Sequence, residues 1–197
     1  MKLGIIMMAS GFSRRFGSNK LLYPIAGRPL FVHTLTNLRQ LMESLSRDFE
    51  TRLTVVSSYP EILERAVIEK ACAVNNPESG EGISASVRLG VKSLPEDTDY
   101  YAFFVADQPY LRPETAEAFI KASIKSGKGI GCVSDGEAAG NPVVFSGKYA
   151  PELKKLSGDT GGKQIIRKYP LDTFIYRVDS GELKDIDSPG DLGKPCI

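Results

Sequence analysis

The chain has 197 residues, of which 42% are hydrophobic and 25% are charged, and its formal net charge is +1. This composition is typical of a soluble globular protein with a sizeable core, and the near-zero net charge argues against a broad basic surface for nucleic acid. No apolar stretch approaches the roughly 20 residues of a membrane span, and no signal-peptide pattern follows the short apolar start. We therefore expect a cytoplasmic protein that binds neither nucleic acid nor a membrane.

Strands and helices alternate along the first two-thirds of the sequence. Short apolar or β-branched runs predict strands, and apolar residues at helical spacing, often after a proline, predict helices. The predicted strands are residues 2–8, 51–57, 71–74, 100–105 and 129–134, and the predicted helices are residues 29–42, 60–70, 83–94 and 113–126. This alternation predicts a parallel sheet with helices on both faces.

The last third of the chain has a different pattern. We expect a short strand at 141–145, a glycine-rich loop at 157–163 followed by a short helix, a strand at 173–178, and a closing segment at 185–192. The sequence shows no repeat, low-complexity tract or linker, so we expect one domain over residues 1–197.

The cysteines and the histidine suggest no chemistry of their own. Cys72, Cys132 and Cys196 lie far apart without a CxxC pair, which predicts reduced, mostly buried thiols rather than a zinc site or disulfides. His33 is the only histidine and falls in the middle of a predicted helix, so we expect a packed or surface residue and no Ser-His-Asp or Cys-His arrangement.

The loop after the first predicted strand carries several features of an anion site. It reads "MMASGFSRRFGSNK" over residues 7–20. Gly11 and Gly17 allow close approach of the backbone to a ligand, and Arg15 and Lys20 can neutralise phosphate oxygens. The spacing matches neither GxxxxGK[ST] nor GxGxxG. The alternative interpretation is a solvated basic turn.

Acidic residues follow two other predicted strands. Asp107, after the apolar strand 100–105, can hold Mg2+ against nucleotide phosphates, but it could also form a turn or helix cap before Pro109. Asp185 and Asp187 alternate in "DIDSPGDL", so in an extended segment only one of them faces a metal directly. Asp187 could alternatively cap the turn that follows it.

A fourth candidate segment is "NNPESGEGISASVRLG", residues 75–90. Its glycines and serines open a predicted helix, and a helix N-terminus of this kind suits polar or anionic ligand groups. Ordinary capping by Ser84 is the alternative. All four segments follow predicted strands, and in open parallel sheets ligands bind at the carboxyl ends of the strands.

Taken together, these segments resemble the molybdenum cofactor nucleotidyltransferases, within the MobA-like NTP transferases. The resemblance covers most of the chain and keeps the order of the motifs. The family's opening motif, roughly LAAGxSxRMGxxK, is matched by Gly11, Ser13, Arg15, Gly17 and Lys20. Ser10 and Phe16 depart from it, where the family has Ala and Met.

Later family motifs are also present. The helix motif is matched by Asn76, Pro77, Gly82, Ser84, Ser86 and Gly90, and the family's DxP by "DQP" at 107–109. Its GDxG loop is matched by Gly158, Asp159 and Gly161, and its closing motif by "DIDSPGDL", with Ser188 in place of Thr. The family's G-x-P strand has a looser match in "GNPVVF".

The resemblance implies an α/β fold, the three-layer Rossmann-like nucleotide-diphospho-sugar transferase fold with a mostly parallel central sheet. It implies an NTP-binding part over about 1–112, and a part that binds the acceptor and completes the metal site over about 113–197. It also implies a cofactor, Mg2+ with Mn2+ as the alternative. Asp107 and Asp187 would hold the metal, and Asp185 would support these ligands without contacting the metal itself.

Further roles follow from the same resemblance. Arg15, Lys20 and Asp107 would be catalytic. The implied nucleotide-binding residues are Ala9, Ser10, Gly11, Ser13, Gly17, Gly82 and Ser86, where Gly82, Ser86 and the main chain of 9–11 read the base. The implied acceptor-binding residues are Gly158, Asp159, Gly161 and Lys163.

The branch of the family is indicated by two of its motifs. The guanylyl branch tends to have a Gly-Gly opening and Asn residues in the closing motif, whereas this chain has Ala-Ser-Gly with Asp185 and Asp187. It therefore resembles the cytidylyl branch, which transfers CMP from CTP to the terminal phosphate of molybdenum-molybdopterin and releases pyrophosphate.

Three alternatives stay open: guanylyl transfer, nucleotidyl transfer to a sugar or polyol phosphate, and a non-catalytic molybdopterin carrier. The resemblance also suggests a molybdenum hydroxylase as the recipient of the product, and a monomer or weak oligomer.

Overall fold

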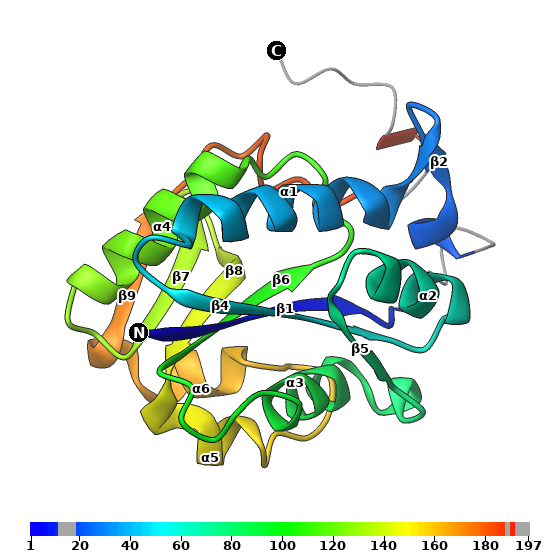
Figure 1. Ribbon diagram of the computed structural model, residues 1–197. Coiled ribbons are helices and arrows are strands. Elements are labelled where there is room, and N and C mark those ends of the chain that lie inside the picture. Colours follow the sequence, from blue (N-terminus) through cyan, green and yellow to red (C-terminus); the bar gives the residue numbers. More distant parts are fainter. Residues whose placement is uncertain (12–18, 188–189, 192–197) are drawn as a thin grey trace.

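A central β-sheet forms the middle layer of the molecule (Figure 1). The computed structural model describes residues 1–11, 19–187 and 190–191. Within these residues the sheet has seven strands in the order β5-β4-β1-β6-β8-β7-β9. Their bounds are β1 (Lys2–Ala9), β4 (Glu50–Ser57), β5 (Cys72–Asn75), β6 (Tyr100–Val105), β7 (Ile130–Ser134), β8 (Ala139–Ser146) and β9 (Thr173–Arg177).

The sheet is mostly parallel, as the sequence predicts. β8 alone among its described strands runs antiparallel to its neighbours, β6 and β7. β7 and β8 are separated by only four residues, 135–138, and so short a connection joins antiparallel strands, whereas a parallel crossover needs a dozen or more residues. All other described pairings are parallel.

The central strand β1 is buried on both faces. Leu3, Ile5 and Met7 pack into the hydrophobic cluster on one side of the sheet, and Ile6 and Met8 pack into the cluster on the other side. Successive side chains of a strand point to opposite faces, so a strand covered on both faces must be apolar throughout. This explains why the run "KLGIIMM" shows no polar alternation.

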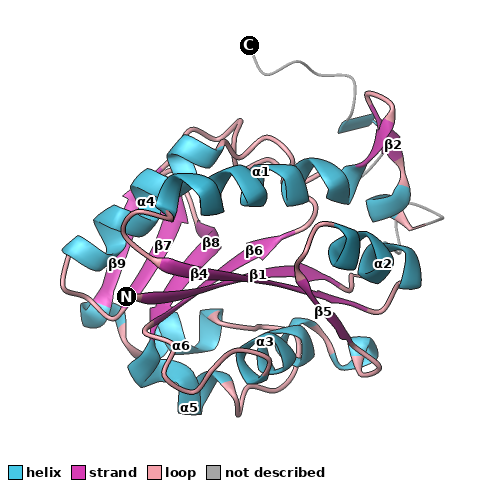
Figure 2. Ribbon diagram, viewed as in Figure 1, coloured by secondary structure: helices cyan, strands magenta, loops and turns pink. Residues whose placement is uncertain are grey.

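Helices cover both faces of the sheet and complete three layers (Figure 2). The cluster on one face receives side chains from α1 (Leu30–Leu45), α2 (Pro60–Ile68) and α4 (Pro113–Lys125). The cluster on the other face receives side chains from α3 (Ile83–Lys92), α5 (Ala150–Leu153) and α6 (Lys163–Lys168). Among the described residues, no helix combines the length and the apolar character that crossing a bilayer requires.

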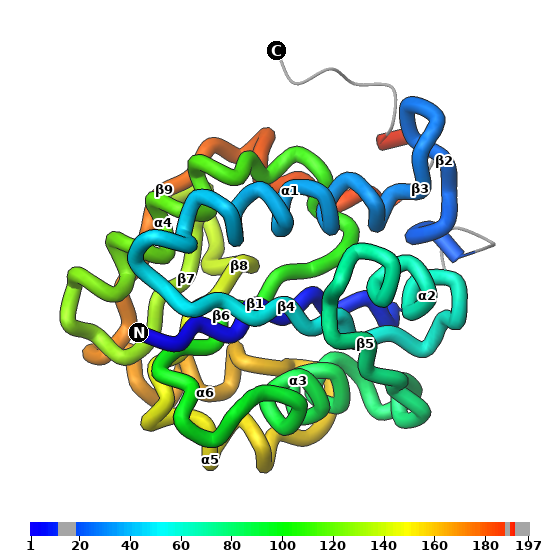
Figure 3. Tube along the Cα trace, viewed as in Figure 1, coloured from blue at the N-terminus to red at the C-terminus, as the bar shows by residue number. Residues whose placement is uncertain are grey.

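A small hairpin precedes α1 and is not predicted from the sequence. β2 (Pro24–Ile25) pairs antiparallel with β3 (Arg28–Pro29), and the two lie apart from the main sheet (Figure 3). Its turn residues, Ala26 and Gly27, both have positive φ values, 47° and 79°. Two-residue turns of this kind usually contain Asn-Gly or Asp-Gly, so an Ala-Gly pair gives little signal.

Two cysteine predictions have different outcomes. Cys72 and Cys132 are both free, as expected, and Cys132 is buried in the central sheet. Cys72 is exposed, which corrects the expectation of mostly buried thiols, because it lies on the edge strand β5. Cys196 lies outside the described residues.

His33 is a packed residue, as predicted. Its Nε2 lies 2.9 Å from the Ile25 carbonyl oxygen, so it joins α1 to the hairpin.

We expect Gly90→Ala to destabilise the protein although alanine favours helices. A Cβ at Gly90 of α3 would lie 2.6 Å from Cγ2 of Ile6 on β1. Overpacking of a tight core costs about 1–3 kcal/mol, which exceeds the gain in helix propensity of about 1 kcal/mol. Urea unfolding of Gly90→Ala in the wild-type and Ile6→Ala backgrounds measures the effect. The loss should disappear when Ile6 is truncated, and an equal loss in both backgrounds would contradict the account.

Candidate active site

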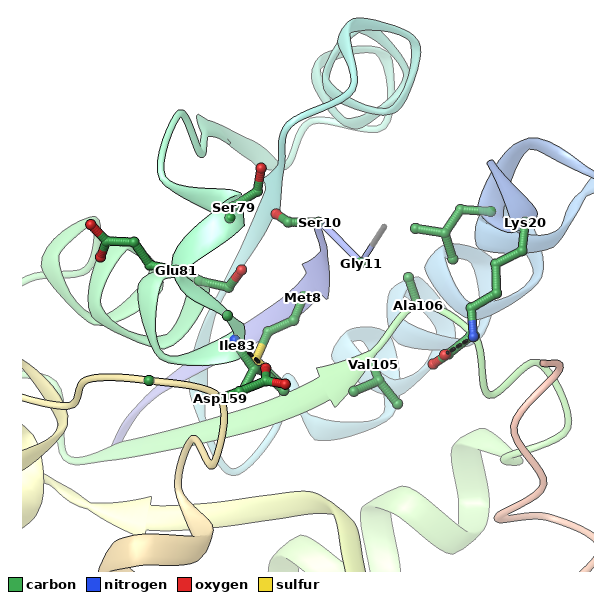
Figure 4. Close-up of a pocket in the computed structure, with 16 residues that line it drawn as sticks. Met8, Ser10, Gly11, Lys20, Ser79, Glu81, Ile83, Val105, Ala106 and Asp159 are labelled. Carbon is green, nitrogen blue, oxygen red and sulfur yellow. Dashed lines mark hydrogen bonds and ion pairs between the residues drawn. The ribbon is translucent and has the colours of Figure 1, made fainter. Parts of the chain in front are cut away.

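A cleft of about 610 Å³ opens where β1 and β6 end and α3 begins (Figure 4). This is the carboxyl edge of the parallel strands, where the sequence analysis places the ligand. The cleft is lined by eight of the predicted site residues: Ser10, Gly11, Lys20, Gly82, Ser86, Asp107, Gly158 and Asp159. Residues from the first loop, from the end of β6, from the start of α3 and from 158–159 therefore meet at one place.

The other predicted site residues lie around this cleft or outside the description. Ala9 is buried at the end of β1. Gly161 and Lys163 line a separate, mostly apolar cavity of about 50 Å³, which shares Met8 and Ile83 with the cleft. Ser13, Arg15 and Gly17 lie outside the described residues.

Lys20 forms the charged centre of one wall. Its Nζ lies 2.7 Å from Oδ2 of Asp107 and 2.7 Å from Oδ1 of Asp187. The Lys20 side chain is only 11% exposed, against 21% for Asp107 and 56% for Asp187. One ammonium thus bridges two carboxylates that the sequence analysis assigns to one metal site.

The electrostatics of Lys20 result from two opposing effects. Burial alone would lower the pKa of its ammonium, because a low dielectric disfavours charge. Hydrogen bonds and ion pairs with Asp107 and Asp187 outweigh burial, so the pKa is raised above its ordinary value. Lys20 is therefore positively charged throughout the neutral range.

Asp185 has a different environment from Asp187. The Asp185 residue is exposed, but its carboxyl group is partly desolvated by the surrounding protein atoms, and this desolvation together with the negative charge of Asp107 raises its pKa to about 6. A hydrogen bond with Gln108 acts in the opposite direction. Among the described contacts, Asp187 forms an ion pair with Lys20, whereas Asp185 forms a hydrogen bond with Gln108.

The donor set at Asp107 and Asp187 fits a hard divalent cation. Mg2+ and Mn2+ prefer carboxylate and phosphate oxygens, and Mg2+ commonly takes one or two carboxylates plus substrate phosphates. Within the described ranges, no three His, Cys, Asp or Glu side chains gather into a ready-made metal cage. A cation here would therefore complete its ligand shell with phosphate oxygens and water.

Hydrogen bonds hold the segment that carries Asp187 against the residues that follow β6. The Ile186 N–H donates to the Asp107 carbonyl oxygen at 3.1 Å, and Gln108 Nε2 donates to the Leu183 carbonyl oxygen at 3.1 Å. Glu182 is buried and accepts hydrogen bonds from Nε of Arg112 at 3.0 Å and from Oγ1 of Thr115 at 3.1 Å. Glu182 is not predicted from the sequence, because an acidic residue in a loop gives no sign of a distant basic partner.

The opposite wall is built on the N-terminus of α3. Gly82 has φ 91° and ψ −173°, a conformation that is essentially restricted to glycine. With no side chain of its own, it leaves the Ile83 N–H to donate to Oδ1 of Asp159 at 3.2 Å. The Ser84 N–H donates to the Gly158 carbonyl oxygen at 3.3 Å. The 158–159 segment thus caps the helix that borders the cleft, and Figure 4 shows Asp159 against Ile83.

Arg88 connects the two segments of this wall by hydrogen bonds. One of its guanidinium nitrogens donates to both Glu78 and Glu81, at 2.8 Å each, and the other donates to the Leu156 carbonyl oxygen at 2.8 Å. The turn Ser79–Glu81 and the 158–159 segment both line the cleft. Arg88 is not predicted from the sequence, because its acceptors lie on segments that become neighbours only in the folded chain.

The main chain of the first loop is fixed at its start by two side chains. Ser10 Oγ donates to the Val56 carbonyl oxygen at 3.3 Å, and Tyr59 OH donates to the Gly11 carbonyl oxygen at 3.0 Å. Because the Ser10 hydroxyl proton is used within the fold, Ser10 offers the cleft its main chain and a hydroxyl lone pair. Tyr59 is a further residue that the sequence analysis does not identify.

We expect Gly82→Ala to destabilise the protein by about 1–3 kcal/mol through backbone strain, because an added Cβ would also lie 2.9 Å from Cα of Asp159. Gly80→Ala is the matched control in the same wall, since a Cβ there meets no atom within 4 Å. Urea unfolding of both variants measures the difference. Equal stability of the two would argue against the contact between Gly82 and Asp159.

Comparisons with known proteins identify the family of the chain. Residues 5–173 match the model of the MobA-like NTP transferase domain. A Pyrococcus horikoshii protein described as a probable molybdenum cofactor guanylyltransferase is 50% identical over 180 residues, which cover 90% of this chain and 83% of that protein. The purine catabolism protein PucB of Bacillus subtilis is 28% identical over 198 residues, covering 93% of this chain and 91% of PucB.

Solved structures share the fold. The crystal structure of Rv0371c from Mycobacterium tuberculosis has a TM-score of 0.77 at 22% identity, covering 97% of this chain and 95% of that chain. The complex of Rv0371c with manganese has a TM-score of 0.71 at 19% identity, covering 91% and 89% of the two chains. With the match to the family model over residues 5–173, the chain belongs to the MobA-like NTP transferase domain family.

Proposed function

We propose that the protein is a metal-dependent nucleotidyltransferase that transfers CMP from CTP to the terminal phosphate of molybdenum-molybdopterin. The observation that carries this proposal is the bridge from Lys20 to Asp107 and Asp187 at the edge of the cleft. A metal-bound triphosphate requires a cationic side chain for its phosphates and carboxylates for its metal. Lys20, Asp107 and Asp187 provide these groups beside a glycine-containing loop. The relative from Pyrococcus horikoshii supports molybdenum cofactor chemistry.

The proposed reaction is an in-line displacement. An oxygen of the acceptor's terminal phosphate forms a bond to the α-phosphorus of CTP, the bond from that phosphorus to the bridging oxygen breaks, and pyrophosphate leaves with the electron pair. The attacking oxygen is already anionic, so no protein group has to remove a proton. The protein's contribution is positioning and neutralisation of charge.

Particular groups of the chain take these roles. Lys20 neutralises charge on the phosphate oxygens, and Arg15 is proposed to act with it. Asp107 and Asp187 hold Mg2+ or Mn2+, which supplies neutralisation of the negative charge on the phosphates. The structure of a protein with the same fold in complex with manganese supports the proposal of a divalent cation.

The acceptor is proposed to lie on the side of the cleft formed by 158–163. Gly158 and Asp159 line the cleft, and Gly161 and Lys163 line the smaller cavity that adjoins it. The base lies against the start of α3, with Gly82 and Ser86. This keeps the nucleotide mainly on residues 1–112 and the acceptor on 113–197.

GTP is the second candidate nucleotide, because the 50% identical relative is described as a guanylyltransferase. CTP is favoured by Asp185 and Asp187, since the guanylyl branch tends to have asparagine in this motif. Incubation with molybdenum-molybdopterin, a divalent metal and either nucleotide, followed by mass analysis, tests the choice. A cytosine dinucleotide supports the proposal, a guanine dinucleotide moves the assignment to GTP, and pterin binding without pyrophosphate release indicates a carrier.

We expect Lys20→Ala to reduce the turnover rate by about 10²–10³, the usual effect of removing one preorganised charge stabiliser. Lys121→Ala is the matched control, because Lys121 also contacts two carboxylates, those of Asp48 and Glu117, but lies on α4 outside the cleft. Pyrophosphate release measures both variants. Turnover of Lys20→Ala close to that of the control would exclude the role proposed for Lys20.

We expect Asp187→Asn to raise the metal concentration needed for half-maximal turnover by about 10- to 100-fold, because the cation loses a charged ligand. Asp48→Asn removes a carboxylate from an ion pair elsewhere on the surface and should leave the metal requirement unchanged. Chelation should abolish wild-type turnover, and Mg2+ or Mn2+ should restore it. An unaltered metal titration in Asp187→Asn would exclude this ligand.

A further inference from the structure

Asn76 is a buried polar residue, and both its amide oxygen and its amide nitrogen form hydrogen bonds. It follows β5 directly and is completely shielded from solvent. Its Oδ1 accepts a hydrogen bond from the Glu78 N–H at 3.1 Å, and its Nδ2 donates to Oγ of Ser86 at 3.0 Å. The backbone is held as well, because the Asn76 N–H donates to the Ser57 carbonyl oxygen at 2.9 Å.

These contacts determine the orientation of the Asn76 amide. The Glu78 N–H can only donate, so the atom that faces it must be the amide oxygen. The amide NH2 group then faces Ser86, and an NH2 group cannot accept. The Ser86 hydroxyl therefore accepts from Asn76, and its own proton is left for another partner.

The Ser86 hydroxyl proton is available for a hydrogen bond to a ligand in the cleft. Ser86 lines the cleft and is 3% exposed, so its hydroxyl is almost fully enclosed. Among the described residues, its hydrogen bond with Asn76 is the one that the hydroxyl forms. A buried hydroxyl proton without an acceptor is costly, and a ligand atom with a lone pair would satisfy it.

We infer that Asn76 is a positioning residue that makes Ser86 a hydrogen-bond donor to the nucleotide base. This inference rests on the proposed function and names the feature of the base that Ser86 selects. The base must present an acceptor at this point, a carbonyl oxygen or an unprotonated ring nitrogen, and a base that presents an N–H there is disfavoured. Cytosine offers both kinds of acceptor on its pairing edge, and guanine offers its carbonyl oxygen.

A purely structural role of Asn76 makes a different prediction. Asn often stabilises a turn by accepting from the N–H two residues on, as it does here from Glu78. That role needs only the oxygen, which aspartate also provides. Asn76→Asp therefore keeps the turn and the shape of the side chain but replaces the NH2 donor by an acceptor. The Ser86 proton must then point to residue 76, and Ser86 presents a lone pair to the base.

The test is a double-mutant cycle on nucleotide affinity, with calorimetry of CTP and GTP in the presence of Mg2+. Ser86→Ala in the wild-type background should weaken binding by about 5- to 20-fold, the effect of one lost hydrogen bond. Asn76→Asp should weaken it at least as much. In the Asn76→Asp background, Ser86→Ala should not weaken binding further and should partly restore it, because it removes the misdirected lone pair.

Inorganic tripolyphosphate with Mg2+ is the control ligand, because it has phosphates and no base. Its affinity should be the same for wild type and all three variants. Equal weakening by Ser86→Ala in both backgrounds, or weakened tripolyphosphate binding, would overturn the inference.

Three further outcomes can be distinguished from these. If Asn76→Asp does not fold, Ser86→Ala with CTP and tripolyphosphate still decides whether Ser86 contacts the base. If wild-type protein binds tripolyphosphate but no nucleotide better than it, the base site is absent and the inference fails while the phosphate site stands. If it binds neither, the proposed function itself fails.

Discussion

The contact of one buried ammonium group with two carboxylates is the interaction on which the cleft depends. Lys20, Asp107 and Asp187 come from three distant parts of the chain. A buried ammonium is tolerated only when it is paired, so Lys20 depends on its carboxylate partners. The sheet order makes the contact feasible, because β1 and β6 are neighbouring parallel strands whose carboxyl ends lie at the same edge of the sheet.

The two walls of the cleft divide the recognition of a ligand. The Lys20 wall carries charge and suits phosphates, which all nucleoside triphosphates share. The α3 wall carries a capped helix N-terminus and the Asn76–Ser86 pair, which offer directed hydrogen bonds. Arg88 and Glu182 do not line the cleft. Arg88 fixes the segments that form the α3 wall, and Glu182 fixes the segment that carries Asp187. Affinity and selectivity can therefore be altered by substitutions in separate places.

Much of the fold follows from local sequence patterns. The strand Tyr100–Val105 is predicted with its observed bounds because it is a continuous apolar run that ends at polar residues. The orientation of β8 and the strand order are not predicted, because they depend on pairing between distant segments. Lys20, Asp107 and Gly82 are identifiable because they follow strands or open a helix. Asn76 is noted in a motif but given no role, and Arg88 and Glu182 are missed, because their partners become neighbours only in the folded chain.

The most direct test of the account is calorimetry of the wild-type protein with CTP, GTP, ATP and UTP, each with Mg2+. We predict that CTP binds with the highest affinity and that omission of the metal weakens its binding. Selective binding of GTP would keep the phosphate site and contradict the assignment of the base. Binding of none of the four, with molybdopterin present or absent, would contradict the proposal that this cleft holds a metal-bound nucleoside triphosphate.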